Sequence, residues 1–240
     1  MVKQLRSVLG LTRHTIEKYN MIEAGDRIAV GVSGGKDSVL LLVTLAKLRQ
    51  FHTVPFSITA ITLDPFFNDQ KGDYSAISAL CERLDVPYIL KPTNIGDVVF
   101  KLREEKNPCS LCARIRRGIL HNAAIEAGCN RLALGHHFDD AVETFFLNLF
   151  HEGRIGCFSP VTYLSRKNLH LIRPFALLSE SEIQEEIQRL QLPVVKSKCP
   201  VDGKTERTKV KELLATLTSN QKDIKQQVMG AMQRAGLNGW

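Results

Sequence analysis

Short apolar runs rich in β-branched residues alternate with longer segments of helical periodicity along most of this chain. The apolar runs cover residues 27–32, 57–63, 86–90, 131–135 and 169–173, and the helical segments between them cover residues 38–49, 75–84, 113–127 and 140–150. Strands that alternate with helices form crossover units, and such units build a mostly parallel sheet. We therefore expect an α/β fold in which helices cover both faces of a parallel five-stranded sheet.

The pattern changes toward both ends of the chain. Residues 1–24 predict a basic amphipathic helix, while residues 180–190 and 206–217 predict charged helices. Residues 192–195 resemble a further strand, and residues 219–240 a polar tail. We expect three parts, namely the N-terminal helix (1–24), the α/β domain (25–200) and a helical C-terminal segment (201–240).

The composition excludes several classes of protein. The chain has 240 residues, of which 44% are hydrophobic and 24% charged, so it is too apolar for a disordered protein and long enough for a sizeable core. Its apolar runs are far shorter than the roughly 18 residues of a membrane-spanning helix. Because no secretory signal is evident either, we expect a cytoplasmic protein. The formal charge of +7 favours a polyanionic partner, although an ordinary basic enzyme is the alternative.

A glycine-rich turn joins the first predicted strand to the helix that follows it. Its sequence is Ser33-Gly-Gly-Lys-Asp-Ser38. The glycines bring backbone N–H groups close to a ligand and the helix N-terminus adds partial positive charge, so the turn is typical of a phosphate site. It fits neither a Walker A loop, because Asp37 follows Lys36, nor the dinucleotide fingerprint. The alternative is a tight turn capped by Ser38.

This hexapeptide resembles the PP-loop of the ATP pyrophosphatases, which cleave ATP between its α and β phosphates and thereby adenylate an oxygen. The resemblance implies that the β and γ phosphates are held by Ser33, Gly34, Gly35, Asp37 and Ser38. Lys36 would be a charge partner of the phosphates, and Asp37 beside them implies Mg²⁺. The adenosine would lie at the carboxyl ends of the first strands, where Leu63 and Asp64 are the candidates, with a turn acid as the alternative for Asp64.

Six cysteines without a secretory signal indicate thiols, metal ligands or redox groups rather than a disulfide framework. Cys109 and Cys112 form a CxxC ahead of a helix that we expect to begin near Ala113, and three arginines follow, so we expect lowered thiol pKa values. A CxxC alone fits half of a zinc site or a redox disulfide equally well. Cys199 lies in a later loop that a parallel sheet could bring to the same edge, and a free thiol is the alternative.

The three remaining cysteines give weaker signals. Cys81 falls on the apolar side of a predicted helix, and Cys129 precedes a predicted strand, so both are interpreted as packing thiols. Cys157 stays undecided between a packing thiol and a second catalytic thiol.

A second polar motif, Gly135-His-His-Phe-Asp-Asp140, also follows a predicted strand and opens a helix. It should therefore face the same crevice as the glycine-rich turn. An aspartate there could bind Mg²⁺ or act as an acid or base, and we favour Asp140 slightly over Asp139. The alternatives are helix N-caps for the two aspartates and a hydrogen-bonded core position for His136.

In this combination the motifs resemble the tRNA 2-thiocytidine synthetase family over residues 3–217. The resemblance implies a Rossmann-like PP-loop fold and a 4Fe-4S cluster on Cys109, Cys112 and Cys199, with one iron open to a hydrosulfide. Some relatives carry a second CxxC at the third position, whereas this chain has Lys196 three residues before Cys199.

The resemblance also assigns roles around the nucleotide. It implies that Gly135 and His136 border ATP, and that catalysis involves Asp140, Asp139 and Cys199. Arg116, on the helix behind the CxxC, would neutralise cluster or substrate charge, with a solvated helix face as the alternative.

The implied function is ATP-dependent sulfur transfer to tRNA, in which the C2 oxygen of an anticodon-loop cytidine is adenylated and then replaced by sulfur. The partners implied are tRNA, a cysteine desulfurase or inorganic sulfide as sulfur donor, and a second copy of the chain, with no membrane. Basic side chains available for tRNA phosphates are Lys3, Arg6, Arg13, Lys18, Arg114, Arg116, Arg117 and those of residues 204–211.

Two other functions use the same motifs. One is sulfur insertion into, or removal from, a small molecule or free nucleobase, and the other is a nucleotide sensor without catalysis. Lysidine synthetase, another PP-loop enzyme that acts on tRNA, lacks the cysteines, so the cysteines of this chain disfavour that activity.

Overall fold

The computed structural model describes residues 3–67, 70–102, 108–195, 199 and 206–240. Its central sheet has six strands in the order β3-β2-β1-β4-β6-β5, and all neighbours are parallel except β5 and β6. The strands are β1 (Asp26–Gly31), β2 (Phe56–Asp64), β3 (Tyr88–Pro92), β4 (Arg131–Ala133), β5 (Val161–Leu164) and β6 (Leu169–Ile172). Five of them coincide with the predicted apolar runs, so the α/β architecture is confirmed.

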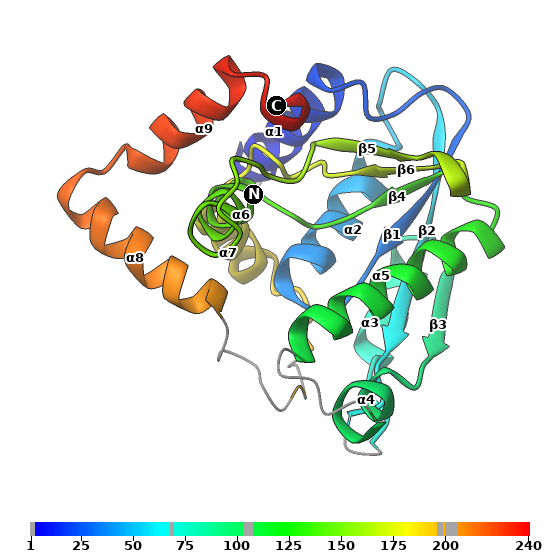
Figure 1. Ribbon diagram of the computed structural model, residues 1–240. Coiled ribbons are helices and arrows are strands. Elements are labelled where there is room, and N and C mark those ends of the chain that lie inside the picture. The colour runs from blue at the N-terminus through cyan, green and yellow to red at the C-terminus, as the bar shows by residue number, and fades with distance from the viewer. Residues whose placement is uncertain (1–2, 68–69, 103–107, 196–198, 200–205) are drawn as a thin grey trace.

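Helices cover both faces of the sheet (Figure 1). They are α1 (Lys3–Lys18), α2 (Lys36–Leu48), α3 (Ser75–Arg83), α4 (Ile95–Asp97), α5 (Pro108–Glu126), α6 (Phe138–His151), α7 (Glu180–Leu190), α8 (Glu206–Asn220) and α9 (Ile224–Arg234), with short turns at Val98–Leu102, Ser165–Lys167 and Leu237–Gly239. Among the described helices, none combines the length and the apolar surface that crossing a bilayer requires.

The alternation of side chains along β1 divides the core into two layers. Ile28 and Val30 belong to the buried cluster that contains α2, whereas Ala29 belongs to the cluster beneath α5. Helix α2 is apolar on nearly all sides because it lies in the core, and Leu40 and Leu41 on it are fully buried.

The carboxyl edge of the sheet positions the two polar motifs. The chain passes from β1 to β2 on one side and returns to β4 on the other, and a crevice forms where the strand order reverses in this way. Val30 of β1 pairs with Ala133 of β4, so the two strands end at the same level. A Cβ atom on Gly135 would lie 3.0 Å from the backbone carbon of Asp37. The shared crevice that the sequence predicts is therefore confirmed.

Three expectations about the fold are wrong. The sheet has a sixth strand, β5, which forms a hairpin with β6 around a turn that ends at Asn168 in the left-handed region (φ 45°). Residues 192–195 form no strand. Their contact with the turn after β1 is a hydrogen bond from the Val195 N–H to the Gly34 carbonyl (2.9 Å).

The third correction concerns the predicted polar tail, residues 219–240. Half of it forms α9, whose Met229 and Met232 are buried against α6 and its surroundings. The two methionines stand three residues apart and so share one side of the helix. The helix lies within residues 201–240, which we expect to be helical, but its single short apolar stripe was too weak a signal to predict its bounds.

Candidate active site at the carboxyl edge of the sheet

A cleft of about 860 Å³ opens between the turn after β1, the start of α6 and one side of α5. Its polar lining includes Ser33, Asp37, Ser38, Arg116, Arg117, His136, Asp140, Arg173 and Arg207. Four arginines against two carboxylates give this lining a positive charge, which favours an anionic ligand. Leu63, Leu120 and Leu134 add an apolar part, as is usual for a small-molecule site.

The glycine-rich turn is held in shape by its two serines. The Ser38 hydroxyl donates to the Gly35 carbonyl (2.9 Å) and lies 3.1 Å from the Ser33 hydroxyl, while Gly34 adopts a φ of +87°. No described side chain caps the N-terminus of α2, which begins after Gly35. Ser38 therefore braces the turn rather than capping the helix, and the first N–H groups of α2 remain available to an anion.

Lys36 does not extend into the cleft. Its ammonium group lies 2.8 Å from an Asp37 carboxylate oxygen and 3.1 Å from one of Glu180 on α7. Burial by itself would lower the pKa of Lys36, but these two carboxylates outweigh it and the pKa is raised. Burial would raise the pKa of Glu180, yet Lys211 and Lys36 lower it to about 2. The loop lysine is thus part of an ion network with α7 and α8.

The two aspartates at the start of α6 have different environments. Asp140 lines the cleft, accepts the His137 backbone N–H (3.1 Å) and pairs with Arg207 of α8 (2.8 Å). Asp139 lies outside the lining, where it accepts the Glu180 backbone N–H (2.8 Å) and pairs with Lys225 of α9 (2.7 Å). Of the two, the carboxylate of Asp140 is the one placed to act on a ligand.

Residues at the end of β2 border the cleft on one side. Leu63 lines the cleft, whereas Asp64 lines a neighbouring cavity of about 270 Å³. Both carboxylate oxygens of Asp64 accept backbone N–H groups of the following loop, from Phe66 (3.2 Å) and Gly72 (3.0 Å). Asp64 therefore shapes this loop, while Arg116 lines both the cleft and the smaller cavity.

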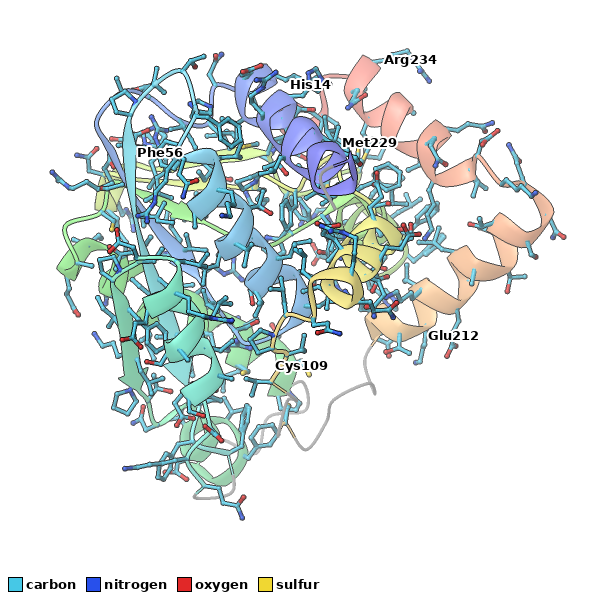
Figure 2. The ribbon with its side chains drawn as sticks, turned by 180° about the vertical axis from the view of Figure 1, so that it is seen from behind. His14, Phe56, Cys109, Glu212, Met229 and Arg234 are labelled. Carbon is cyan, nitrogen blue, oxygen red and sulfur yellow. The ribbon has the colours of Figure 1, made fainter. Side chains whose placement is uncertain are left out.

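The CxxC lies inside α5, not ahead of it, because α5 begins at Pro108, a residue well suited to a first helical position. Cys109 and Cys112 are therefore one turn apart on the same side of the helix. Figure 2 shows Cys109 in the lower half of the view, well below Met229 and Arg234 of α9.

The expected lowering of the thiol pKa values is wrong. Burial and the nearby Cys199 thiol raise the pKa of Cys109. Burial also raises the pKa of Cys112, where the effects of Cys199 and Cys109 add to it and Arg116 opposes it. All three thiols are thus close enough to influence one another. Within the described residues, however, no group of three potential metal-ligating side chains is arranged around a common point.

The remaining cysteines are packing thiols. Burial raises the pKa values of Cys81 and Cys157 to about 11, and Cys129 is buried as well. Cys157 borders the cleft, but its thiol donates to the Ala141 carbonyl (3.2 Å). A thiol held in this way is a poor nucleophile at neutral pH.

Comparisons with known proteins agree with this geometry. A family model for the PP-loop domain matches residues 8–217. Over 236 residues the chain is 35% identical to the tRNA-cytidine(32) 2-sulfurtransferase of Syntrophotalea carbinolica, covering 95% of this chain and 88% of the relative. The protein of the same name from Pelobacter propionicus is 36% identical over 235 residues, covering 97% and 86%. The chain belongs to the tRNA-cytidine(32) 2-sulfurtransferase family.

A solved structure shares the fold of this family member. The U34-tRNA thiolase NcsA from Methanococcus maripaludis, which contains a 4Fe-4S cluster, aligns with a TM-score of 0.79 at 24% identity and covers 96% of this chain and 79% of its own. The predicted PP-loop fold and the resemblance to the tRNA 2-thiocytidine synthetases are both confirmed.

The structure of this 2-sulfurtransferase family member brings half of the sixteen predicted site residues to one cleft. Those that line it are Ser33, Asp37, Ser38, Leu63, Arg116, Gly135, His136 and Asp140. Sequence reasoning missed Arg173, Arg207 and Glu180. Arg173 ends a predicted strand at the same edge and could have been found from that position, whereas nothing in the sequence indicated which element Arg207 or Glu180 would contact.

Proposed function

We propose that this chain transfers sulfur to a cytidine of tRNA after ATP has adenylated the C2 oxygen of the base. The observation that carries the proposal is a single positively charged cleft that joins the PP-loop turn, Asp140 and the arginines of α5, with the CxxC at the start of that same helix. The relatives described above are tRNA-cytidine(32) 2-sulfurtransferases, which supports this choice of substrate.

In the proposed reaction the turn after β1 holds the β and γ phosphates on its backbone N–H groups and on the N-terminus of α2. Asp37 would bind Mg²⁺ between those phosphates. The C2 oxygen attacks the α phosphorus, pyrophosphate leaves, and the base carries an adenylate. A sulfur nucleophile then bonds to C2 and AMP leaves. Asp140 lies in the cleft where it would bind Mg²⁺ or accept a proton from the base.

Cys109, Cys112 and Cys199 are the residues that would hold a 4Fe-4S cluster. The effect of the Cys199 thiol on the pKa values of Cys109 and Cys112 supports this assignment, because three thiols in one neighbourhood are the donor type that such clusters use. A cluster bound there would supply the sulfur nucleophile. The resident side chains keep the nucleotide and the base oriented for that attack.

Exposed arginines beside the cleft provide the proposed tRNA contacts. Arg114, Arg116 and Arg117 of α5 are all exposed, and Arg116 and Arg117 line the cleft. Two other basic residues that the sequence offered are already paired, since Arg13 lies 3.6 Å from Glu17 and Lys211 lies 2.7 Å from Glu180. The side chains of Lys3 and Arg6, and Lys204, lie outside the described part of the chain. The target nucleotide must leave its stack to enter the cleft.

The remaining partners stay proposals. A cysteine desulfurase or inorganic sulfide would supply sulfur, and a second copy of the chain would complete a homodimer.

Anaerobic purification with iron and sulfide analysis, followed by mass spectrometry of nucleosides after reaction with tRNA, ATP and sulfide, tests the function. We expect an iron–sulfur protein that produces 2-thiocytidine. Cys109→Ala, Cys112→Ala and Cys199→Ala should each lose iron and product. The matched control Cys129→Ala removes a buried thiol that does not line the cleft, and it should lose neither.

Two results would contradict the proposal. A colourless, iron-free wild type that still thiolates tRNA would remove the cluster from it. An iron–sulfur protein that leaves tRNA unchanged but modifies a free nucleobase would replace the tRNA substrate with a small molecule.

A further inference from the structure

One wall of the cleft is organised by Arg173, at the carboxyl end of β6. Its guanidinium is buried and donates from Nε to Nδ1 of His136 (3.2 Å) and from Nη1 to the Ser159 carbonyl (2.5 Å). The same group lies over the ring of Phe158, with 4.9 Å between the Cζ atom and the ring centroid. Arg173, His136 and Phe158 all line the cleft.

The hydrogen bond from Arg173 decides which nitrogen of His136 carries the proton. A guanidinium can only donate, so Nδ1 of His136 must be the acceptor, and the proton of the neutral ring is then on Nε2. Nε2 makes no hydrogen bond to any described residue, and the ring borders the cleft. His136 therefore offers the cleft an N–H donor.

Burial and the charges around His136 keep the ring neutral. Burial is the largest effect and Arg173 the second; Arg207 and His137 act in the same direction, and Asp140 opposes them. Together they lower the pKa of His136 to about 4. Near neutral pH the ring is thus a donor at Nε2 and does not exchange protons as an acid or base.

Residues distant in the sequence hold this wall in place. The ring of Phe158 stacks on His136 with 5.2 Å between ring centroids. The Trp240 indole N–H donates to the Phe158 carbonyl (2.6 Å), and the Asn238 side-chain oxygen accepts the Cys157 backbone N–H (2.9 Å). Contacts on both sides of the loop leave its aromatic ring little freedom to turn away from His136.

We propose that His136 donates a hydrogen bond from Nε2 to an oxygen of the bound substrate, and that Arg173 is the positioning residue that fixes His136 in the donor tautomer. The acceptor is a phosphate oxygen of the nucleotide or the carbonyl oxygen of the base, since both are oxygen acceptors that this positively charged cleft favours. The inference rests on the proposed function and adds a role for a side chain that was placed only beside the nucleotide.

The proposal separates two substitutions of His136. In His136→Gln the amide keeps an N–H donor but cannot titrate, so kcat/KM should stay within about fivefold of wild type. His136→Ala has no donor and should lose about 10²-fold. His151→Gln is the matched control, because His151 ends the helix α6 that follows His136, is exposed and is outside the cleft.

Arg173→Lys keeps the charge but not the planar fork that holds Nδ1, so it should lower activity at least about tenfold in the wild-type background. In the His136→Gln background its effect should be smaller, because glutamine has no tautomer to fix. ¹⁵N chemical shifts of labelled histidine should show a neutral Nε2–H ring in the wild type and a tautomer mixture in Arg173→Lys, a change that a merely structural role would not cause.

The kinetic constants identify the acceptor. A rise in KM for ATP in His136→Ala assigns the hydrogen bond to a phosphate, and a loss in kcat or in KM for tRNA at constant KM for ATP assigns it to the base. Equal inactivity of His136→Gln and His136→Ala, or full activity of both, would overturn the proposal. If the wild type does not thiolate tRNA, the proposed function fails separately. The ¹⁵N spectrum still decides the tautomer, and an Nδ1–H or doubly protonated ring at neutral pH would refute its assignment.

Discussion

At the scale of single residues, Gly135 lies very close to the turn after β1. A Cβ atom at position 135 would lie 3.0 Å from the Asp37 backbone carbon and 3.1 Å from the Ser38 nitrogen. Both atoms belong to the backbone of the glycine-rich turn, which cannot yield as a flexible side chain can. The glycine therefore sets the spacing between the loops after β1 and β4.

This contact predicts a result for Gly135→Ala. The added methyl group should displace the turn, weaken the binding of a non-hydrolysable ATP analogue at least about tenfold and destabilise the fold by about 1–3 kcal/mol. Isothermal titration calorimetry and urea unfolding measure the two effects. Gly118→Ala is the control, because a Cβ there meets nothing within 4 Å; inside α5 it should stabilise the fold by up to about 1 kcal/mol. Unchanged binding in Gly135→Ala would contradict the argument.

The lowered pKa of His136 predicts a pH dependence of stability. Between its ordinary value of 6.5 and about 4, the unfolded chain takes up a proton that the folded chain does not. The free energy of unfolding should therefore fall as the pH falls through this window, by up to about 3 kcal/mol from this residue. The buried His121, whose pKa is also lowered, acts in the same direction.

Urea unfolding of wild type and His136→Gln, from about pH 7 to about pH 4.5, measures this dependence. The variant should lose less stability on acidification than the wild type does. Glu180, with a pKa of about 2, contributes stability that is lost only below its ordinary value of 4.5, and so hardly affects this range. Parallel curves for the two proteins would show that His136 is protonated alike in both states.

At the scale of elements, α8 is attached to α6 through a charged contact. Arg207 pairs with Asp140 (2.8 Å) and with the buried Glu143 (3.3 Å). Burial raises the pKa of Glu143, and Arg207 is the largest influence that opposes it. Beside this contact, Val210 and Leu214 of α8 are buried in one cluster with Val142 of α6. The arginine thus compensates a buried carboxylate while the helix packs through its apolar residues.

Arg207→Ala should therefore destabilise the protein by about 1–3 kcal/mol, because it leaves the Glu143 carboxyl buried without its cation. Lys209→Ala removes an exposed pair with Glu206 on the same helix and should change stability by less than about 0.5 kcal/mol. Chemical denaturation of the two variants gives the comparison. Equal effects would mean that α8 is held by its apolar contacts alone.

The elements that could be predicted are those with a strong period or a special turn. The five apolar runs and the helix after Ser33-Gly-Gly-Lys-Asp-Ser38 follow from local sequence, so the sheet and the glycine-rich part of the cleft could be placed. Strand β5 is only four residues long, and its place beside β6 depends on a tertiary contact. Arg207 and Glu180 reach the site from helices whose docking no local pattern specifies, and for this reason they were missed.

At the scale of the whole molecule, the basic side chains behind the net charge of +7 are not equally available to a partner. Many basic side chains are engaged in ion pairs, whereas Arg114, Arg116 and Arg117 form an exposed group on α5 next to the cleft. We expect a polyanion to be attracted more strongly to this group than to the residues that are already in ion pairs. The net charge alone left nucleic-acid binding open. The position of these arginines on α5 indicates where a nucleic acid would bind.

If the arginines of α5 contact tRNA phosphates, Arg114→Ala should weaken tRNA binding and reduce the slope of log K against log salt concentration by about one. Fluorescence anisotropy over a series of KCl concentrations measures this slope. Lys47→Ala removes an exposed charge from the far end of α2 and should leave the slope unchanged. The same loss of slope in both variants would indicate a general charge effect rather than a binding surface on α5.

The contact between Val195 and the turn after β1 also limits the chain that follows it. The Val195 N–H donates to the Gly34 carbonyl (2.9 Å), and Cys199 comes four residues later. Four residues reach at most about 14 Å when fully extended. The third thiol must therefore lie within about this distance of Val195, which is hydrogen-bonded to the glycine-rich turn. The length of this interval, more than the identity of its residues, therefore limits where the third thiol can lie. Insertions between Val195 and Cys199 should lengthen this segment and lower the activity while the fold stays intact.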